Sequence, residues 1–124
     1  MAFDIDMPAA ARRNLGAADH LDSGGVAGYL YGIAAECAIK AMMVGVPSAR
    51  RDDLLYLHFP DLRIQLRDSL QGRSAATLAA FVNNDGFLNN WHVKMRYSNG
   101  RQIRSEWVRA WQKQARQAVN AMGT

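Results

Sequence analysis

The stretch Tyr29-Leu-Tyr-Gly-Ile-Ala-Ala-Glu-Cys-Ala-Ile-Lys40 decides the fold of this 124-residue chain. Its apolar side chains recur at spacings of three and four residues, which is the period of a buried helix face. Gly28 and Gly32 have no side chains, so a neighbouring helix can approach the backbone closely at these two positions. We therefore predict a closely packed helix over about residues 25–45.

Helical periodicity continues on both sides of this stretch, and no segment alternates as a strand would. We predict further helices that begin near Asp6–Pro8, near Pro60–Asp61, near Ala75 and after Ser105. Such a pattern is typical of an all-α protein, an antiparallel up-and-down bundle of four to five helices. The length of the chain fits one domain over residues 1–124.

Charge is distributed unevenly along the chain. Residues 1–90 carry eight Lys/Arg against ten Asp/Glu, whereas residues 91–124 carry seven Lys/Arg against the single acid Glu106. This asymmetry suggests an anionic partner for the C-terminal third. An ordinary solvated helix face is the alternative. The residues predicted to bind nucleic acid are Arg101, Arg104, Arg109, Lys113 and Arg116, of which the last three share one helix face opposite Trp111.

Several classes of protein and site are disfavoured. No apolar run approaches the length of a membrane span, and the start of the chain has two acids and no basic leader, so we expect a cytoplasmic protein without a signal peptide. One cysteine, Cys37, excludes an internal disulfide and a multi-cysteine zinc site. Phosphate-loop and nucleophile-elbow signatures are missing. We predict no metal and no cofactor.

The stretch Trp91-His-Val-Lys-Met-Arg-Tyr97 adds a candidate polar site. Arg96 must reach solvent or meet an acid, because an unpaired buried charge costs several kcal/mol. Glu36 is the one acid inside a strongly apolar helical run, so we predict an ion pair between Glu36 and Arg96. If the stretch is helical, His92 lies one turn from Arg96 and can accept or relay a proton, although an ordinary, partly exposed histidine is the alternative. His58, just ahead of a helix, is expected to hydrogen-bond the backbone there.

Together these features resemble the HEPN family of small helical proteins. The resemblance covers nearly the whole chain and rests on four segments, Tyr31-Gly-Ile-Ala-Ala-Glu-Cys-Ala-Ile-Lys-Ala41, His58-Phe-Pro-Asp-Leu62, Trp91-x-x-x-x-Arg96-Tyr97 and Gln117-Ala-Val-Asn-Ala121. It implies a helical bundle that dimerises. It also implies RNA cleavage, binding of RNA or a nucleotide, or partnership with a minimal nucleotidyltransferase in toxin–antitoxin and defence systems.

Ribonucleases of this family carry an arginine followed four to six positions later by a histidine. Arg96 is the matching arginine, but residues 97–104 contain no histidine. We therefore expect a non-catalytic homodimer that binds RNA, a nucleotide or a protein partner. One alternative is a metal-independent endoribonuclease that combines Arg96 with His92 or His58 and the second copy, with Glu36 beside Arg96. Another is an accessory subunit of a nucleotidyltransferase.

Overall fold

The computed structural model describes residues 3–21 and 24–123 of the chain. Within these ranges there are helices and no strands, so the predicted all-α bundle is confirmed. The long helices of the described ranges are α1 (Met7–Leu21), α2 (Gly24–Met43) and α6 (Ser105–Ala121). The shorter elements are η1 (Pro47–Ala49), α3 (Asp52–Leu55), α4 (Asp61–Ser69), η2 (Arg73–Ala75), α5 (Ala76–Val82) and η3 (Val93–Tyr97), where η marks a 3₁₀ helix.

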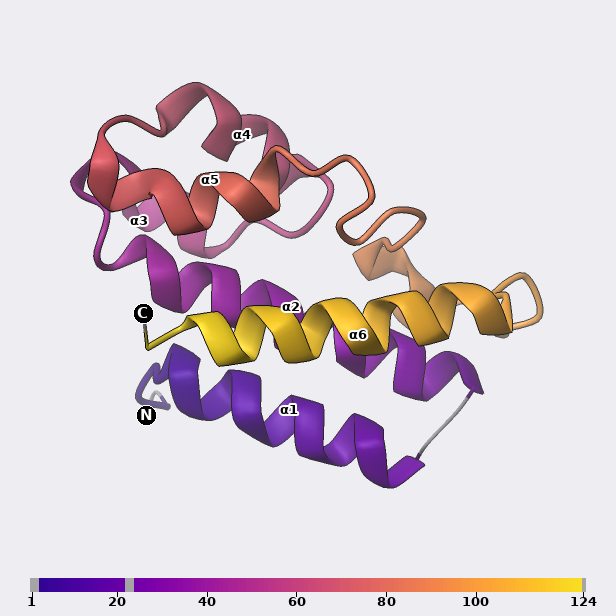
Figure 1. Ribbon diagram of the computed structural model, residues 1–124. Coiled ribbons are helices and arrows are strands. Elements are labelled where there is room, and N and C mark those ends of the chain that lie inside the picture. The colour runs from indigo at the N-terminus through magenta and orange to yellow at the C-terminus, as the bar shows by residue number, and fades with distance from the viewer. Residues whose placement is uncertain (1–2, 22–23, 124) are drawn as a thin grey trace.

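Helix α2 is the centre of the arrangement, since it contacts α1, α5, α6 and η3. Figure 1 shows α1 and α2 running antiparallel, and α6 running alongside α2 in the same direction. The short helices α3, α4 and α5 gather over the C-terminal half of α2, whereas the segment that contains η3 lies near the N-terminal half of α2. The two ends of α2 therefore face different surroundings.

Two local features that predicted helices from the sequence are present in the structure. The N–H of Ala9 donates a hydrogen bond of 3.0 Å to the Asp6 carboxylate, which is an N-cap, and Pro8 lies in the first turn. In α6 the division into an apolar and a basic face is confirmed. Its buried residues are Val108, Trp111, Ala115 and Ala118, whereas Arg109, Lys113 and Arg116 are exposed.

The glycines of α2 are where other parts of the chain approach its backbone most closely. A Cβ atom on Gly28 would lie 3.0 Å from both Trp111 and Val108 of α6. A Cβ atom on Gly32 would lie only 1.8 Å from Nε1 of Trp91, whose indole is buried. The expected close packing at these glycines is therefore made within one chain, by α6 and by Trp91, and this face of α2 is not free to meet a second copy.

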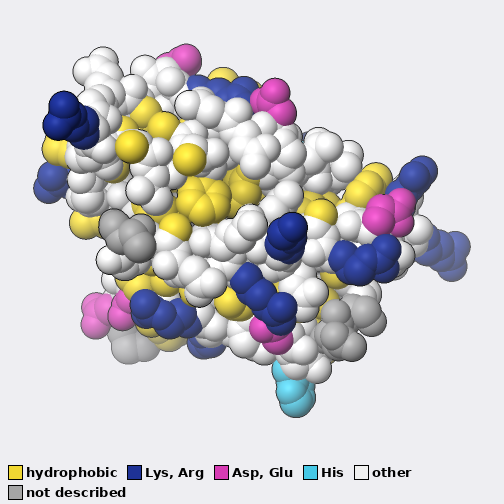
Figure 2. Space-filling view, in the orientation of Figure 1, with side chains coloured by type: hydrophobic (Ala, Val, Ile, Leu, Met, Phe, Trp, Pro, Cys, Tyr) yellow, Lys and Arg dark blue, Asp and Glu magenta, His cyan; other side chains and the backbone are white. Residues whose placement is uncertain are grey.

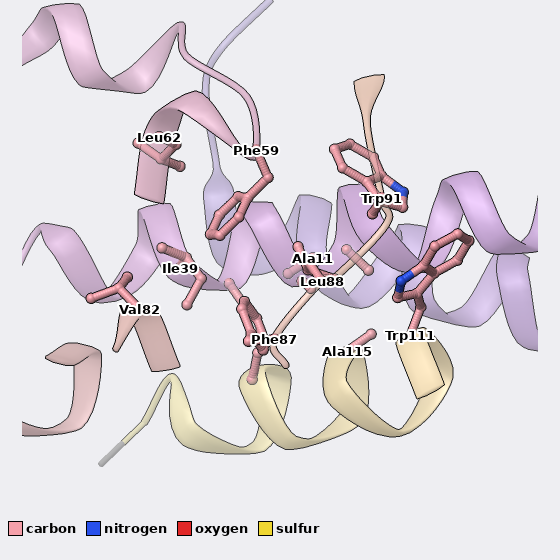
Figure 3. Packing of buried hydrophobic residues seen from close by; sticks show 14 of the residues in the cluster. Ala11, Ile39, Phe59, Leu62, Val82, Phe87, Leu88, Trp91, Trp111 and Ala115 are labelled. Carbon is pink, nitrogen blue, oxygen red and sulfur yellow. The ribbon is translucent and has the colours of Figure 1, made fainter. Parts of the chain in front are cut away.

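A cluster of aromatic rings joins the short helices to α2 and α6 (Figure 3). The rings of Phe59 and Phe81 each meet the Phe87 ring edge-on, with centroids 5.7 Å and 5.3 Å apart. Side chains of this size each contribute about 1.5–3 kcal/mol on full burial. This core holds in place the segment that leads from α5 to Trp91.

Asp19 links the three long helices through one carboxylate oxygen. Its Oδ1 accepts hydrogen bonds from Tyr31 of α2 at 2.7 Å and from Arg116 and Gln112 of α6 at 2.9 and 3.2 Å. Burial alone raises the pKa of Asp19, but the hydrogen bonds from these three side chains and the Arg116 charge outweigh it and lower the pKa below 3.8. Burial and the Asp19 contact raise the pKa of Tyr31 to about 12, so its hydroxyl stays a donor.

Replacing Gly32 by Ala should destabilise the fold strongly. The new methyl group would occupy space that the Trp91 indole fills, and overpacking of this kind costs about 3 kcal/mol. The matched control is Gly16→Ala in the middle of α1, where a Cβ meets nothing within 4 Å. The control should stabilise the helix by up to about 1 kcal/mol. Chemical denaturation of both variants measures this, and equal stabilities would contradict the packing at Trp91.

Protonation of the Asp19 carboxylate should account for part of the loss of folding stability in acid. Because the folded state lowers the pKa of this group, its contribution is present above about pH 4 and is lost as the pH falls through the lowered value. Asp19→Asn should therefore be less stable than the parent protein at neutral pH, and the difference should shrink in acid. Asp68→Asn, an exposed acid without an ion pair in the described chain, is the control. A difference that does not change with pH would contradict this role.

Candidate functional site

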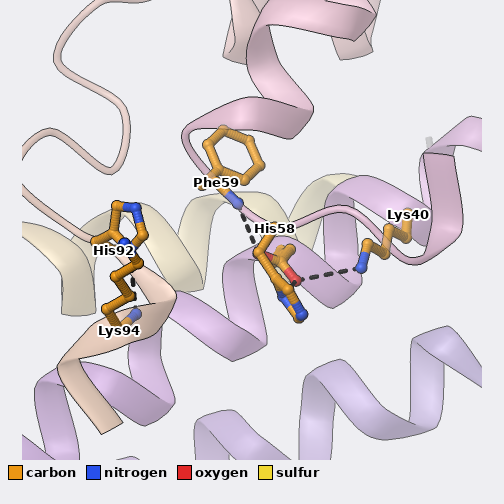
Figure 4. A network of polar contacts seen from close by, with 6 residues as sticks. Lys40, His58, Phe59, His92 and Lys94 are labelled. Carbon is orange, nitrogen blue, oxygen red and sulfur yellow. Dashed lines mark hydrogen bonds and ion pairs between the residues drawn. The ribbon is translucent and has the colours of Figure 1, made fainter. Parts of the chain in front are cut away.

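Glu36 is a buried carboxylate with partners on both oxygens (Figure 4). Its Oε1 lies 3.2 Å from Nζ of Lys40, one turn later on α2, and 2.7 Å from Nδ1 of His58. Its Oε2 accepts a hydrogen bond of 3.0 Å from the N–H of Phe59. The side chain of Glu36 therefore ties the turn that precedes α4 to the middle of α2.

The predicted ion pair between Glu36 and Arg96 is wrong. Glu36 lies seven residues after Tyr29 on α2, about 10 Å further along the helix axis, whereas Arg96 lies over the Tyr29 ring. Trp91 packs against α2 between them, at Gly32. The expectation that His58 bonds the backbone at the start of α4 is also wrong, because its ring faces Glu36 instead.

Arg96 lies between two tyrosine rings. Its guanidinium carbon is 5.6 Å from the ring centroids of both Tyr29 and Tyr97, a geometry that favours cation–π attraction. Tyr29 in turn stacks on Trp91 at 6.0 Å. Burial raises the pKa of the Tyr29 phenol, and the nearby Arg96 charge offsets this in part. Tyr97 is 81% exposed, so one face of this stack is open to solvent.

A pocket of about 510 Å³ lies beside this stack, between the N-terminus of α2 and residues 95–103. Among the described residues its lining includes two arginines, Arg96 and Arg101, and no acidic side chain. Neither arginine has an ion pair among the described residues. Gly25, in the first turn of α2, also lines the pocket, and unpaired N–H groups at a helix N-terminus add partial positive charge. The pocket therefore favours an anion.

A second pocket of about 270 Å³ adjoins the first, since Met95, Ser98 and Ile103 line both. It is lined in addition by His92, Lys94 and Trp107 among others. The Arg104 guanidinium lies 5.5 Å from the Trp107 ring, so here too a cation covers an aromatic side chain. Arg104 also has a long contact of 3.8 Å with exposed Glu106, which contributes little.

His92 and Arg96 do not face a common pocket. His92 precedes η3, and its Nδ1 accepts a hydrogen bond of 3.0 Å from the N–H of Lys94, so the hydrogen of a neutral ring is on Nε2. His92 lines the smaller pocket and Arg96 the larger one. Of the three predicted catalytic residues, Arg96 lies on η3 and His92 lies just before it, whereas Glu36 lies about two turns along α2 from Tyr29, the residue that Arg96 covers.

The basic stripe on α6 is only partly free. Arg109 and Lys113 are exposed without an ion pair in the described chain, but Arg116 is held by Asp19 at 2.9 Å. Figure 2 shows Lys and Arg side chains spread over the face that α6 presents. The free cations Arg109 and Lys113 follow Arg101 and Arg104 along the chain, which extends positive charge from the pockets onto α6.

The sequence contained one signal for this site that we missed. Glu36 and Lys40 are four residues apart, the spacing of a helical ion pair, so their contact was readable from the chain alone. The contribution of Tyr29 to the larger pocket had no such signal. It depends on where residues 95–103 return to α2, which no local pattern specifies.

In the described ranges no group of three or more His, Cys, Asp or Glu side chains is placed to hold a metal ion. Among the described helices none has the length and hydropathy needed to cross a membrane. Comparison of the chain with known protein families, with curated proteins and with solved structures found no match. A function must therefore be inferred from the chemistry of the two pockets.

Replacing Glu36 by Gln should destabilise the protein by about 3 kcal/mol, because the charge of Lys40 would remain buried without a counter-ion. Changing both residues, Glu36→Gln with Lys40→Met, should recover much of this loss, since no charge is then stranded. Asp53→Asn removes an exposed ion pair with Arg51 and should leave the free energy of unfolding nearly unchanged. Denaturant titrations of the variants measure these differences. A Glu36→Gln variant as stable as the parent would contradict the network.

Proposed function

We propose that this chain is a cytoplasmic, HEPN-like protein of a toxin–antitoxin or defence-type system, and that it binds single-stranded RNA without cutting it. One observation carries the binding proposal. Residues 94–107 place cations without strong acid partners beside exposed or half-exposed aromatic rings, around two adjoining pockets. The expectation that RNA is not cut rests on the sequence, since no histidine follows Arg96 at the spacing of the ribonucleases.

The chemistry of this band fits a single strand. Proteins that bind single strands combine a basic groove along the phosphates with aromatic side chains on which bases stack, each worth about 1–3 kcal/mol. Arg96 and Arg101 are the phosphate ligands of the proposal, and Tyr97 and Trp107 are its stacking platforms. Arginine suits this task because its planar, always charged fork pairs with two phosphate oxygens at once.

The extent of the basic surface favours a strand over a single nucleotide. One nucleotide would fill only the larger pocket, whereas Arg104 and Trp107 lie beside the smaller one and Arg109 and Lys113 lie further along α6. A strand that passes both pockets would reach Arg104 and Trp107, and one that continues around α6 would meet Arg109 and Lys113 on the face opposite Trp111. An acidic protein partner, including a nucleotidyltransferase, would meet the same charges but would leave the aromatic platforms without bases to stack on.

A homodimer is part of the proposal, since the HEPN resemblance implies one. The space beside Gly28 and Gly32 is already occupied by side chains of the same chain, so a second copy would need another apolar surface. The N-terminal segment offers one. Phe3 is 91% and Ile5 64% exposed, and both line a hollow of about 690 Å³ that also reaches Cys37.

If the proposal is right, affinity for a fluorescent single-stranded RNA should fall steeply with salt, by roughly 0.7 counterions for each phosphate contact. Arg96→Gln combined with Arg101→Gln should weaken binding and reduce that slope by about 1.4, because two contacts are lost. The matched control is Arg50→Gln with Arg73→Gln, which removes the same charge from exposed positions outside both pockets.

Equal slopes for the two double variants would contradict the assignment of the pocket. Absence of binding even at low salt would overturn the RNA proposal and would favour an accessory subunit with a protein partner. Cleavage of the RNA that His92→Ala or His58→Ala abolishes would replace a binder with a ribonuclease.

A further inference from the structure

Asn99 and Gly100 lie at the lining of the larger pocket and are the only Asn-Gly pair in the sequence. The binding proposal gives them no role. The pair stands between Ser98 and Arg101, in an exposed turn that follows η3. What singles it out is the chemistry that an asparagine followed by glycine can undergo with water alone.

The backbone nitrogen of Gly100 is open to reaction with the Asn99 side chain. Gly100 has no side chain of its own to shield its nitrogen, and the space beside its Cα is open, since a Cβ there would meet nothing within 4 Å. The N–H of Gly100 donates to Ser98 Oγ at 3.2 Å, while the Ser98 hydroxyl donates to the carbonyl of Met95. Ser98 therefore presents a lone pair to the proton that Gly100 must give up.

The carbonyl group of the Asn99 side chain is activated in the same turn. Its Oδ1 accepts a hydrogen bond of 3.0 Å from the N–H of Arg101, which would stabilise negative charge that develops on that oxygen. The pocket adds the Arg96 and Arg101 side chains, and its described lining holds no acid, so its field favours the anionic intermediate. In the described chain Nδ2 of Asn99 makes no hydrogen bond that would retain it as a leaving group.

We propose that Asn99-Gly100 is a self-modifying site that converts the Asn99 amide to a carboxylate at the lining of the basic pocket. The Gly100 nitrogen attacks Cγ of Asn99 and loses its proton, the Cγ–Nδ2 bond breaks, and ammonia leaves with that proton. Water then opens the cyclic imide at either carbonyl and gives aspartate or isoaspartate. The sum is one amide and one water converted to one carboxylate and one ammonium ion.

The consequence for binding rests on the proposed function. A carboxylate beside Arg96 and Arg101 would compete with a phosphate for these two cations and would repel it. One unit charge a few ångströms from a phosphate in water weakens binding about fivefold. The conversion is irreversible under these conditions, so it would reduce RNA affinity as the protein ages.

Peptide mass spectrometry of the full chain, incubated at physiological pH and temperature, tests the modification directly. The peptide that contains Asn99 should increase in mass by the difference between O and NH, and it should do so before any other asparagine-containing peptide. Asn84 is an internal control, because its Oδ1 also accepts a backbone N–H two residues later, at 2.9 Å, but the next residue is Asp85 and carries a Cβ. An Asn99 that stays intact after Asn84 has converted would overturn the proposal.

Two variants test the consequence separately. Asn99→Asp reproduces one product and should bind a fluorescent single-stranded RNA about fivefold more weakly than Asn99→Gln, which keeps a neutral amide. Equal affinities would overturn the effect on binding. If neither variant nor the parent protein binds RNA, the proposed function fails, whereas the peptide measurement still decides whether Asn99 is modified.

Discussion

The contact of the Trp91 indole with the backbone of α2 at Gly32 is the constraint on which the site depends. Only a residue without a side chain admits the ring this closely, because a Cβ atom would lie 1.8 Å from Nε1. With Trp91 fixed, the Tyr29 ring stacks on it, Arg96 covers Tyr29, and η3 is held against the first half of α2. The larger pocket is then made by the return of residues 95–103 past the start of α2, and the smaller one lies between the same segment and α6.

Glu36 performs the corresponding task in the middle of α2. Its carboxylate gathers Lys40, His58 and the N–H of Phe59, so the segment before α4 is bound to the same helix. Anchoring here is electrostatic, whereas at Gly32 it is steric. A single helix therefore positions both the short-helix layer and the basic pocket. Arg96 and Arg101, the cations of the proposed binding site, stay outside this network and have no ion pair in the described chain.

The helices were predictable from the sequence because apolar spacing, the Asp6 cap and the glycines act locally. The partners of the buried charges were not. Glu36 had two candidate cations, and the prediction chose distant Arg96 over Lys40 one turn away, although helical spacing favoured the neighbour. The larger pocket could not be predicted either, since it forms where a loop packs against α2, some seventy residues earlier in the chain. Charge asymmetry pointed to the C-terminal third, where Arg101, Arg109 and Lys113 have no ion pair in the described chain.

Photo-crosslinking to a thiouridine-substituted single-stranded RNA, followed by peptide mapping, would identify the side chains of this protein that contact RNA. If RNA binds at the two pockets, adducts should form on the segment that contains Tyr97 and Trp107, and on the first turns of α2 beside Tyr29. Tyr56 offers a built-in comparison, because it is 74% exposed but lies outside both pockets. Adducts on Tyr56 as frequent as those on Tyr97 would contradict the account.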